Sequence, residues 1–195
     1  RAVVNSTTRA MVVADFPFGS YESGPDAALA TGIRFFKEAK AHGVKLEGGK
    51  RVVPQIKKLI ESGIPVMGHL GLTPQSVHAL GGFKVQGRGD DAARIIEDAK
   101  ALEAVGVFAL VLELVPEELA EQITKELSIP VIGIGAGAKC DAQVLVWTDL
   151  MGITKNAPKL AKAYRNLRIE MLNAAKEYAN DVSSGQFPGP EQTFH

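Results

Sequence analysis

The sequence is poor in the features that mark several large classes of protein. It contains one cysteine, Cys140, so no intramolecular disulfide can form, and this is compatible with a reducing, cytoplasmic compartment. Its 22 basic and 22 acidic side chains cancel, which argues against a nucleic-acid partner and against a polybasic membrane surface. No run approaches the roughly 18 consecutive apolar residues of a membrane span. Neither nucleic acid nor membrane is therefore an expected partner.

The sequence does contain enough apolar material for one packed domain. Apolar residues make up 46% of the 195, and no break in composition marks a second domain. We therefore expect a single domain over residues 1–195. Its last part, residues 183–195, holds several glycines and prolines and is expected to be an irregular tail.

Short β-rich runs alternate with helical patterns along the chain. Each run is too short for a helix and lacks a clean polar–apolar alternation, as in strands that are covered on both faces. The expected strands are 11–15, 44–47, 65–69, 108–113 and 131–134, and a sixth run at 144–147 could instead continue a helix. The helices with the clearest apolar stripe or cap are 90–106, 116–127 and 158–182.

The joints between helices and strands indicate parallel strands. Glycine follows three helices, at Gly43, Gly63 and Gly106, where it would supply a left-handed turn before the next strand begins. Short joints of this kind, without a hairpin signal, predict repeated βαβ units. The fold class is therefore α/β with a parallel sheet.

Polar side chains at the ends of four successive strands favour a barrel over an open sheet. These are Asp15, Glu47, His69 and Glu113. A doubly wound sheet gathers its ligands at one switch point, whereas a barrel spreads functional residues over many strand ends. The difficulty is the count, because an eight-stranded barrel usually takes about 250 residues and only six strands are found in this sequence.

The first two of these residues also have structural interpretations. Asp15 either binds a ligand or caps the turn that begins at Phe16. Glu47 lies on the same side of its strand as Lys45, and the two glycines that follow would let a ligand approach the backbone. The alternative for Lys45 and Glu47 is an ordinary ion pair.

His69 and Glu113 likewise have both a functional and a structural interpretation. A lone histidine such as His69 is more often a satisfied structural residue than a ligand or a base. Glu113 is the most isolated charge in the chain, and a carboxylate desolvated by apolar neighbours is a candidate general base. Its alternative is a structural partner for a buried lysine or arginine.

Two glycine-rich segments carry weaker signals. Residues 133–137 do not form a G-x-G-x-x-G motif, and we interpret them as glycines that clear space over the mouth of the barrel. The connection 71–89 is long for a loop between a strand and a helix. It carries Lys84 and Arg88, which suit an anionic group, although a solvated loop is the alternative.

The oxygen donors Asp15 and Glu47 suit a hard divalent cation, with Mg²⁺ as the first choice. The sequence shows no metal-type spacing of cysteine and histidine, no G-x-S-x-G and no Walker loop. A metal ion here would clamp a substrate through two oxygens and acidify the neighbouring carbon. The residues themselves therefore point to carbanion chemistry next to a carbonyl.

At these residues the chain resembles the ketopantoate hydroxymethyltransferase (3-methyl-2-oxobutanoate hydroxymethyltransferase) family. The resemblance runs in family order over nearly the whole chain, in segments whose combination is far more specific than any single motif. The matching segments are 12–21, 44–49, 68–77, 81–89, 112–116, 129–137 and 187–194.

The resemblance implies a (β/α)8 TIM barrel of the phosphoenolpyruvate/pyruvate superfamily. It also implies a large homo-oligomer, which is a decamer in known members. The implied reaction transfers a hydroxymethyl group from the co-substrate 5,10-methylenetetrahydrofolate to 3-methyl-2-oxobutanoate. The product is 2-dehydropantoate, for pantothenate biosynthesis, and the reaction passes through an enolate stabilised by Mg²⁺.

The resemblance further implies a role for each candidate residue. Asp15 matches the aspartate that holds Mg²⁺, which chelates the keto acid, and Glu47 matches the glutamate that supports the coordination sphere of the metal. Lys45 matches the lysine that binds the keto acid, and His69 matches a histidine near the substrate. Glu113 matches the base that takes the proton from the branched carbon.

The sequence departs from the family pattern in three places. Gln192 and Thr193 stand where the family usually has His-Ser, and Ala142 stands where glycine is common. Family chains also begin earlier, with two further barrel strands and a Gly-Asp-Ser motif whose aspartate is the second protein ligand of the metal. We therefore expect the first two strands of the barrel to be missing from the chain as it begins at Arg1.

Two other functions are consistent with the same residues. One is a different Mg²⁺-dependent carbon–carbon lyase or mutase of the same superfamily, which the segments at 45–49 and 81–87 argue against. The other is a non-catalytic barrel remnant that only assembles with other chains. The remnant is opposed by the presence of Asp15, Lys45, Glu47 and Glu113, and the lack of the second metal aspartate favours it.

Overall fold

The computed structural model describes residues 1–194, and the chain divides into two compact units. The first unit is Arg1–Val144, and the second begins at Leu145. Within the described residues, no helix combines the length and apolar character that crossing a membrane requires.

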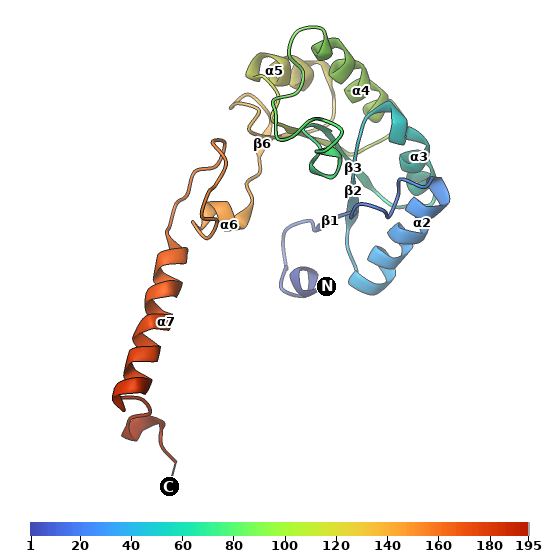
Figure 1. Cartoon of the computed structure of the whole chain (residues 1–195). Coiled ribbons are helices and arrows are strands. Elements are labelled where there is room, and N and C mark those ends of the chain that lie inside the picture. Colours follow the sequence, from blue (N-terminus) through green and yellow to red (C-terminus); the bar gives the residue numbers. More distant parts are fainter. Residues whose placement is uncertain (195) are drawn as a thin grey trace. The chain divides into compact units, whose positions relative to one another are not determined.

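The first unit is built on a parallel sheet of six strands that follow one another in chain order (Figure 1). Every neighbouring pair is parallel, as the glycine joints predicted. The strands are β1 (Val13–Asp15), β2 (Gly43–Glu47), β3 (Val66–Gly71), β4 (Ala109–Glu113), β5 (Val131–Ile134) and β6 (Ala142–Gln143).

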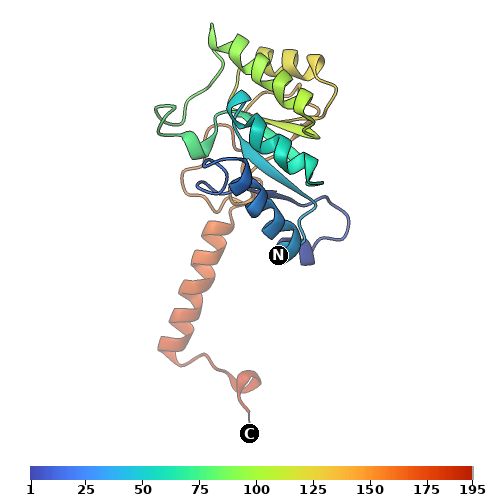
Figure 2. The ribbon, with the colours of Figure 1, turned by 90° about the vertical axis from the view of Figure 1, so that its right-hand side faces the viewer.

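The helices between these strands lie along one face of the sheet, as Figures 1 and 2 show. A short helix, α1, spans Ala2–Asn5. The covering helices are α2 (Pro25–Arg34), which continues as a π-helical turn over Phe35–Ala39, α3 (Val53–Glu61), α4 (Asp91–Val105) and α5 (Glu117–Glu126). Two 3₁₀ turns, Lys50–Val52 and Pro74–Ser76, follow β2 and β3.

Sequential strand order with all helices on one side is the arrangement of a (β/α) barrel. A doubly wound sheet would reverse its strand order and carry helices on both faces. The structure is thus an open partial barrel of six strands, and the predicted α/β barrel class is confirmed.

The core lies between the sheet and these helices. Gly68 illustrates how closely they pack, because a Cβ atom there would lie 2.9 Å from Leu102 of α4. Leu46, Leu70 and Leu112 share this helix-facing side of their strands and are at most 3% exposed. The residues that alternate with them face away from the helices.

One predicted glycine turn is replaced by another residue. Gly63 and Gly106 adopt left-handed φ angles of 83° and 100°, as expected. After the π-helical turn, however, the left-handed residue is Lys40, at φ 59°, and Gly43 is the first residue of β2. Glycine at position 43 serves close packing, since a Cβ atom would lie within 3.3 Å of Phe108 and of the Pro65 carbonyl.

The sixth strand and the last helix differ from the predicted ranges. β6 precedes the predicted 144–147 run, and a short helix, α6 (Trp147–Leu150), begins at the end of that run. The last helix, α7 (Leu167–Ser184), starts well after residue 158. The segment before α7 is bonded elsewhere, because the N–H groups of Tyr164 and Leu167 donate to the carbonyls of Leu150 and Met151.

α7 ends at Gly185, whose φ of 73° gives the left-handed C-cap. The 3₁₀ turn Pro190–Gln192 follows within the predicted irregular tail.

Gly49, in the first turn of chain beyond β2, leaves room for a buried carboxylate. Asp98 of α4 is 7% exposed, and its Oδ1 accepts a hydrogen bond from the N–H of Lys50 at 2.8 Å. Arg94 donates to the other oxygen at 3.3 Å. A Cβ atom at Gly49 would overlap the Asp98 carboxyl group. The segment after β2 is therefore fixed to α4 by a contact that requires glycine.

We expect Gly49→Ala to destabilise the protein by about 1–3 kcal/mol, the usual cost of overpacking a filled site. Urea denaturation of the wild type and the variant measures the change. In an Asp98→Ala background the overlap is removed, so Gly49→Ala should then cost little. Equal costs in the two backgrounds would show that Asp98 is not what excludes a side chain at position 49.

Candidate active site

The strand register gathers all five predicted residues on one face of the sheet. Asp15 on β1 pairs with Lys45 on β2. Glu47, two residues further along β2, pairs with His69 on β3. Gly71, two residues beyond His69, pairs with Glu113 on β4. Since residues two apart share a face, the five side chains lie together on the side away from the covering helices.

Lys45 connects the first strand to the third. Its Nζ lies 2.9 Å from Oδ1 of Asp15 and 3.1 Å from Nδ1 of His69. An ammonium group can only donate, so the contact with His69 corresponds to an unprotonated Nδ1. The Lys45 side chain is 15% exposed and that of Asp15 is 55% exposed. Asp15 is thus the more accessible member of the pair.

His69 is buried between two carboxylates. Its Nδ1 lies 3.6 Å from Oε1 of Glu47, and its Nε2 lies 3.2 Å from Oε2 of Glu113. The second contact is within ion-pair distance but lacks the alignment of a hydrogen bond, so Nε2 has no hydrogen-bond partner among the described residues. Burial lowers the pKa of His69 most strongly, but Glu113 and Glu47 together outweigh it and the net pKa is raised.

Glu47 is 2% exposed, and both of its carboxylate oxygens face polar groups. Oε2 accepts a hydrogen bond from the N–H of Gln75 at 3.0 Å, and Oε1 faces His69. Burial alone would raise the pKa of this carboxyl group. The nearby His69 imidazole, the Gln75 N–H and the charge of Lys45 together lower it below its usual value.

Glu113 ends β4 at a point where the backbone turns sharply. The next residue, Leu114, has a left-handed φ of 47°, which is strained for a leucine. Its N–H donates to the Ile134 carbonyl and its carbonyl accepts from the N–H of Gln86, each at 2.9 Å. The Glu113 side chain is 16% exposed. Two backbone hydrogen bonds thus hold a strained turn that places a partly accessible carboxylate beside His69.

The sequence left open that Asp15 caps a turn, that Lys45 and Glu47 form an ion pair, and that Glu113 pairs with a buried lysine or arginine. The observed partners of these residues are in part different. The Asp15 carboxylate pairs with Lys45. Lys45 is closest to Asp15 and His69, and the nearest basic group to Glu113 is the His69 imidazole, in place of a lysine or arginine. The five residues therefore form one connected cluster, and their individual roles stay predictions.

The glycine-rich segments serve internal packing at several positions. The space beside Gly49 is filled by Asp98, where a ligand approach was expected. In 133–137, a Cβ atom at Gly137 would overlap Glu117, and one at Gly133 would lie 3.0 Å from Sγ of Cys140. Lys84 and Arg88 lie on the long connection after β3, and both are exposed.

Two residues of the site were missed by the sequence reasoning. Gln75 bonds Glu47 through its N–H, and its side chain bonds the Tyr21 hydroxyl at 3.1 Å and the Phe16 carbonyl at 2.6 Å. In the sequence, Gln75 lies in the long connection 71–89 and in the matching segment 68–77, and Tyr21 ends the matching segment 12–21, but no pattern predicts a role for either side chain. Their contacts join positions more than 50 residues apart, which no local pattern signals.

Two of the cavities among the described residues lie outside this cluster. One, of about 500 Å³, is lined by Lys50, Arg51 and Arg94, with Leu70 and Ile95 among its apolar residues. Its lining also includes Gly48, the residue after Glu47, and Gly71, two residues after His69.

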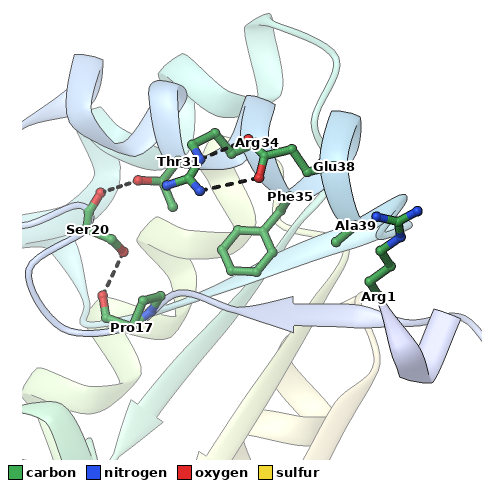
Figure 3. A pocket seen from close by; sticks show the side chains of 8 residues that line it. All are labelled: Arg1, Pro17, Ser20, Thr31, Arg34, Phe35, Glu38 and Ala39. Carbon is green, nitrogen blue, oxygen red and sulfur yellow. Dashed lines mark hydrogen bonds and ion pairs between the residues drawn. The ribbon is translucent and has the colours of Figure 1, made fainter.

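The other cavity, of about 410 Å³, is bordered by α2 and is shown in Figure 3. There Arg34 and Glu38 pair with each other at 3.0 Å, and Thr31 donates to the carbonyl of Ser20 at 2.8 Å. None of the five residues of the cluster lines this cavity. The cavity is therefore separate from the cluster.

The donor set can be compared with the needs of Mg²⁺. Among residues 1–194, no three His, Cys, Asp or Glu side chains are grouped so that they could hold a metal ion. Mg²⁺, however, is usually bound through one or two carboxylates, with water and substrate oxygens completing the octahedron. The exposed Asp15 carboxylate fits that requirement, while buried Glu47 fits a supporting position.

Burial raises the pKa of Tyr21 from 10.0 to about 12. We expect the Tyr21 phenolate to appear with a midpoint near 12 in an absorbance titration at ultraviolet wavelengths, and to be lost in Tyr21→Phe. The unfolded chain ionises near pH 10, so this group makes the free energy of unfolding fall as pH rises from 10 towards 12. A Tyr21 signal that titrates near the ordinary tyrosine pKa would contradict the buried hydroxyl.

Comparison with known proteins shows the family of this chain. Residues 1–190 match the ketopantoate hydroxymethyltransferase family. The 3-methyl-2-oxobutanoate hydroxymethyltransferase of a Nocardioides species is 56% identical over all of this chain and 66% of its own length. The enzyme of that name from Leifsonia xyli is 54% identical over all of this chain and 70% of its length.

Among solved structures, N-acetylneuraminate lyase from Mycoplasma synoviae aligns with a TM-score of 0.41 and 14% identity, over 64% of this chain and 43% of that chain. That likeness is too weak to support an inference. The curated relatives are decisive, although the chain spans only about two thirds of their length. On the family match and these identities, the chain belongs to the ketopantoate hydroxymethyltransferase family.

Proposed function

We propose that the protein containing this chain is a 3-methyl-2-oxobutanoate hydroxymethyltransferase that acts in pantothenate biosynthesis. It transfers a one-carbon unit from 5,10-methylenetetrahydrofolate to the branched carbon of 3-methyl-2-oxobutanoate and gives 2-dehydropantoate. The observation that carries this proposal is the connected cluster on one face of β1 to β4. There a partly accessible carboxylate, Glu113, and an ammonium group, Lys45, both contact the buried imidazole of His69.

In this reaction Glu113 acts as the base. It takes the proton from the branched carbon, and the electron pair of that C–H bond moves into the enolate of the keto acid. A carboxylate that is only 16% exposed is shielded from bulk water yet still open to a small substrate. The backbone turn at Leu114 fixes its direction.

Lys45 binds the keto acid and offsets the negative charge that develops on it. Its ammonium group is held between Asp15 and His69, so little reorganisation is needed when the charge appears. His69 in turn links the group that removes the proton to the group that receives the charge. We assign it a substrate-proximal role without a covalent step.

Asp15 is the residue that we propose as a ligand of Mg²⁺, with Glu47 supporting the coordination sphere from its buried position. When bound, the metal polarises the keto acid and increases the acidity of the branched carbon. The accessibility of Asp15 and the hydrogen bond that fixes Glu47 support this assignment.

The second half of the reaction forms the carbon–carbon bond. The one-carbon unit of 5,10-methylenetetrahydrofolate is bound to two folate nitrogens. Addition of water to this carbon breaks both C–N bonds and releases tetrahydrofolate, and the nucleophilic carbon of the enolate adds to the resulting formaldehyde-level carbon. The overall balance takes up one molecule of water, whose oxygen supplies the new hydroxyl group. We further infer a cytoplasmic homo-oligomer, a decamer by resemblance to the family.

The full gene product should form tetrahydrofolate from 5,10-methylenetetrahydrofolate and 3-methyl-2-oxobutanoate when Mg²⁺ is present. Removal of the metal with EDTA should abolish the reaction, and added Mg²⁺ should restore it. Absence of turnover with both substrates and Mg²⁺ would refute the proposed function.

Glu113→Gln should bind 3-methyl-2-oxobutanoate but lose exchange of the proton on its branched carbon. The amide keeps the size of the side chain and removes its basicity, so exchange should fall by about 10²-fold or more. Proton NMR in deuterium oxide measures the exchange, and calorimetry measures the binding. Exchange at the wild-type rate would mean that another residue is the base.

A further inference from the structure

Gln75 connects three segments around the active site. Its N–H donates to Oε2 of Glu47 at 3.0 Å, and its Nε2 donates to the carbonyl oxygen of Phe16 at 2.6 Å. Its Oε1 accepts from the Tyr21 hydroxyl at 3.1 Å. These partners are 28, 59 and 54 positions away in the sequence. One half-buried residue thus joins the loop after β1, through its side chain, and the end of β2, through its backbone N–H, to the turn after β3.

Tyr21 contacts both Gln75 and the backbone of Glu47, and we call this set of contacts the junction. Its side chain is 1% exposed, and its hydroxyl lies 3.3 Å from the Glu47 carbonyl oxygen. The same hydroxyl accepts from the N–H of Glu47 at 3.4 Å. A hydroxyl has one proton, and the Oε1 of Gln75 is the nearer of its two acceptors. The backbone and the side chain of Glu47 are therefore both held by the Tyr21–Gln75 pair.

The hydrogen bond from Gln75 to the Phe16 carbonyl also fixes the backbone next to the Asp15 carboxylate. Phe16 directly follows Asp15, is fully buried, and donates its N–H to the Lys45 carbonyl at 3.0 Å. Its own carbonyl is held by Gln75. The peptide next to Asp15 and the carboxylate of Glu47 thus share one anchor, although they belong to different strands.

We infer that Gln75 is a positioning residue that, with the Tyr21 hydroxyl, sets the separation between the Asp15 and Glu47 carboxylates. Gln75 acts through these two residues. The inference rests on the proposed function, in which Asp15 and Glu47 support the binding of the cation and the keto acid. A purely structural clamp would affect stability alone, whereas a positioning residue also affects substrate binding and turnover beyond its effect on stability.

The test compares Gln75→Leu, Tyr21→Phe and the double variant in the full gene product. Thr31→Val is the matched control, because it removes a half-buried hydrogen bond, Thr31 Oγ1 to the Ser20 carbonyl, from the same loop without contacting Glu47 or Phe16. Each protein is measured for melting temperature, for calorimetric binding of 3-methyl-2-oxobutanoate and for kcat/KM. Crystal structures of the wild type and Gln75→Leu give the separation of the Asp15 and Glu47 carboxyl groups.

We expect Gln75→Leu to lower kcat/KM by about 10–100-fold, the scale of a small misplacement of binding groups. Binding of the keto acid should weaken, and the carboxyl separation should change. The double variant should lose little more than Gln75→Leu, because both side chains act on one junction. Thr31→Val should stay within about twofold of the wild type, because its hydrogen bond lies outside that junction. Tyr21→Phe keeps the ring, so it provides the test if Gln75→Leu does not fold.

Wild-type kcat/KM in Gln75→Leu, or in Tyr21→Phe if the former does not fold, would overturn the inference. An equal loss of kcat/KM in Thr31→Val, at equal loss of melting temperature, would also overturn it. An inactive wild type would instead refute the proposed function. The two crystal structures would then still decide whether Gln75 sets the separation of the carboxyl groups.

Discussion

The buried contact of His69 with residues on two neighbouring strands imposes the main constraint on this site. Its two ring nitrogens face Lys45 and Glu47 on β2 and Glu113 on β4. Burial of this many ionisable groups is unfavourable unless each finds its partner. A shift of one residue in the pairing of β3 would turn His69 towards the helices and away from Glu47 and Glu113. The parallel register is therefore a requirement of the site as well as of the sheet.

This constraint explains why the strands are joined so tightly at their carboxyl ends. Gly68, just before His69, lets Leu102 of α4 pack against β3, and Asp98 of α4 fixes the segment after Glu47. The helices thus hold the strand ends from one side. The Tyr21–Gln75 pair holds them from the loops. Residues that touch no substrate account for much of the precision of the site.

Much of the fold was predictable because its signals are local. The strands that end at Asp15, Glu47 and Glu113 were predicted to within about two residues at either end, since short apolar runs bounded by glycine joints need no distant information. The start of α7 was not predictable in this way. Its apolar stripe extends back to residue 160, but the backbone of Tyr164 bonds to Leu150, and a helical pattern alone does not reveal that competition.

The residues of the site also fall into those that local sequence signals reveal and those that only the tertiary contacts reveal. Polar residues at strand ends were found because charges in apolar runs stand out, and the resemblance gave them roles. Gln75 gave no such signal, because a glutamine in a loop is unremarkable until its three partners from distant segments are known. The glycines after Glu47 were correctly noticed, but the space beside Gly49 is occupied by Asp98. Sequence can show that glycine is needed without showing what fills the space.

The most direct test of this account is a crystal structure of the full gene product with 3-methyl-2-oxobutanoate and Mg²⁺. The account predicts a Glu113 carboxylate oxygen within about 3–3.5 Å of the branched carbon, the spacing of a reactive complex. It also predicts the Lys45 ammonium on an oxygen of the keto acid. A keto acid bound elsewhere, for example in the cavity lined by Lys50 and Arg51, or bound at the cluster with Glu113 turned away from the branched carbon, would contradict it.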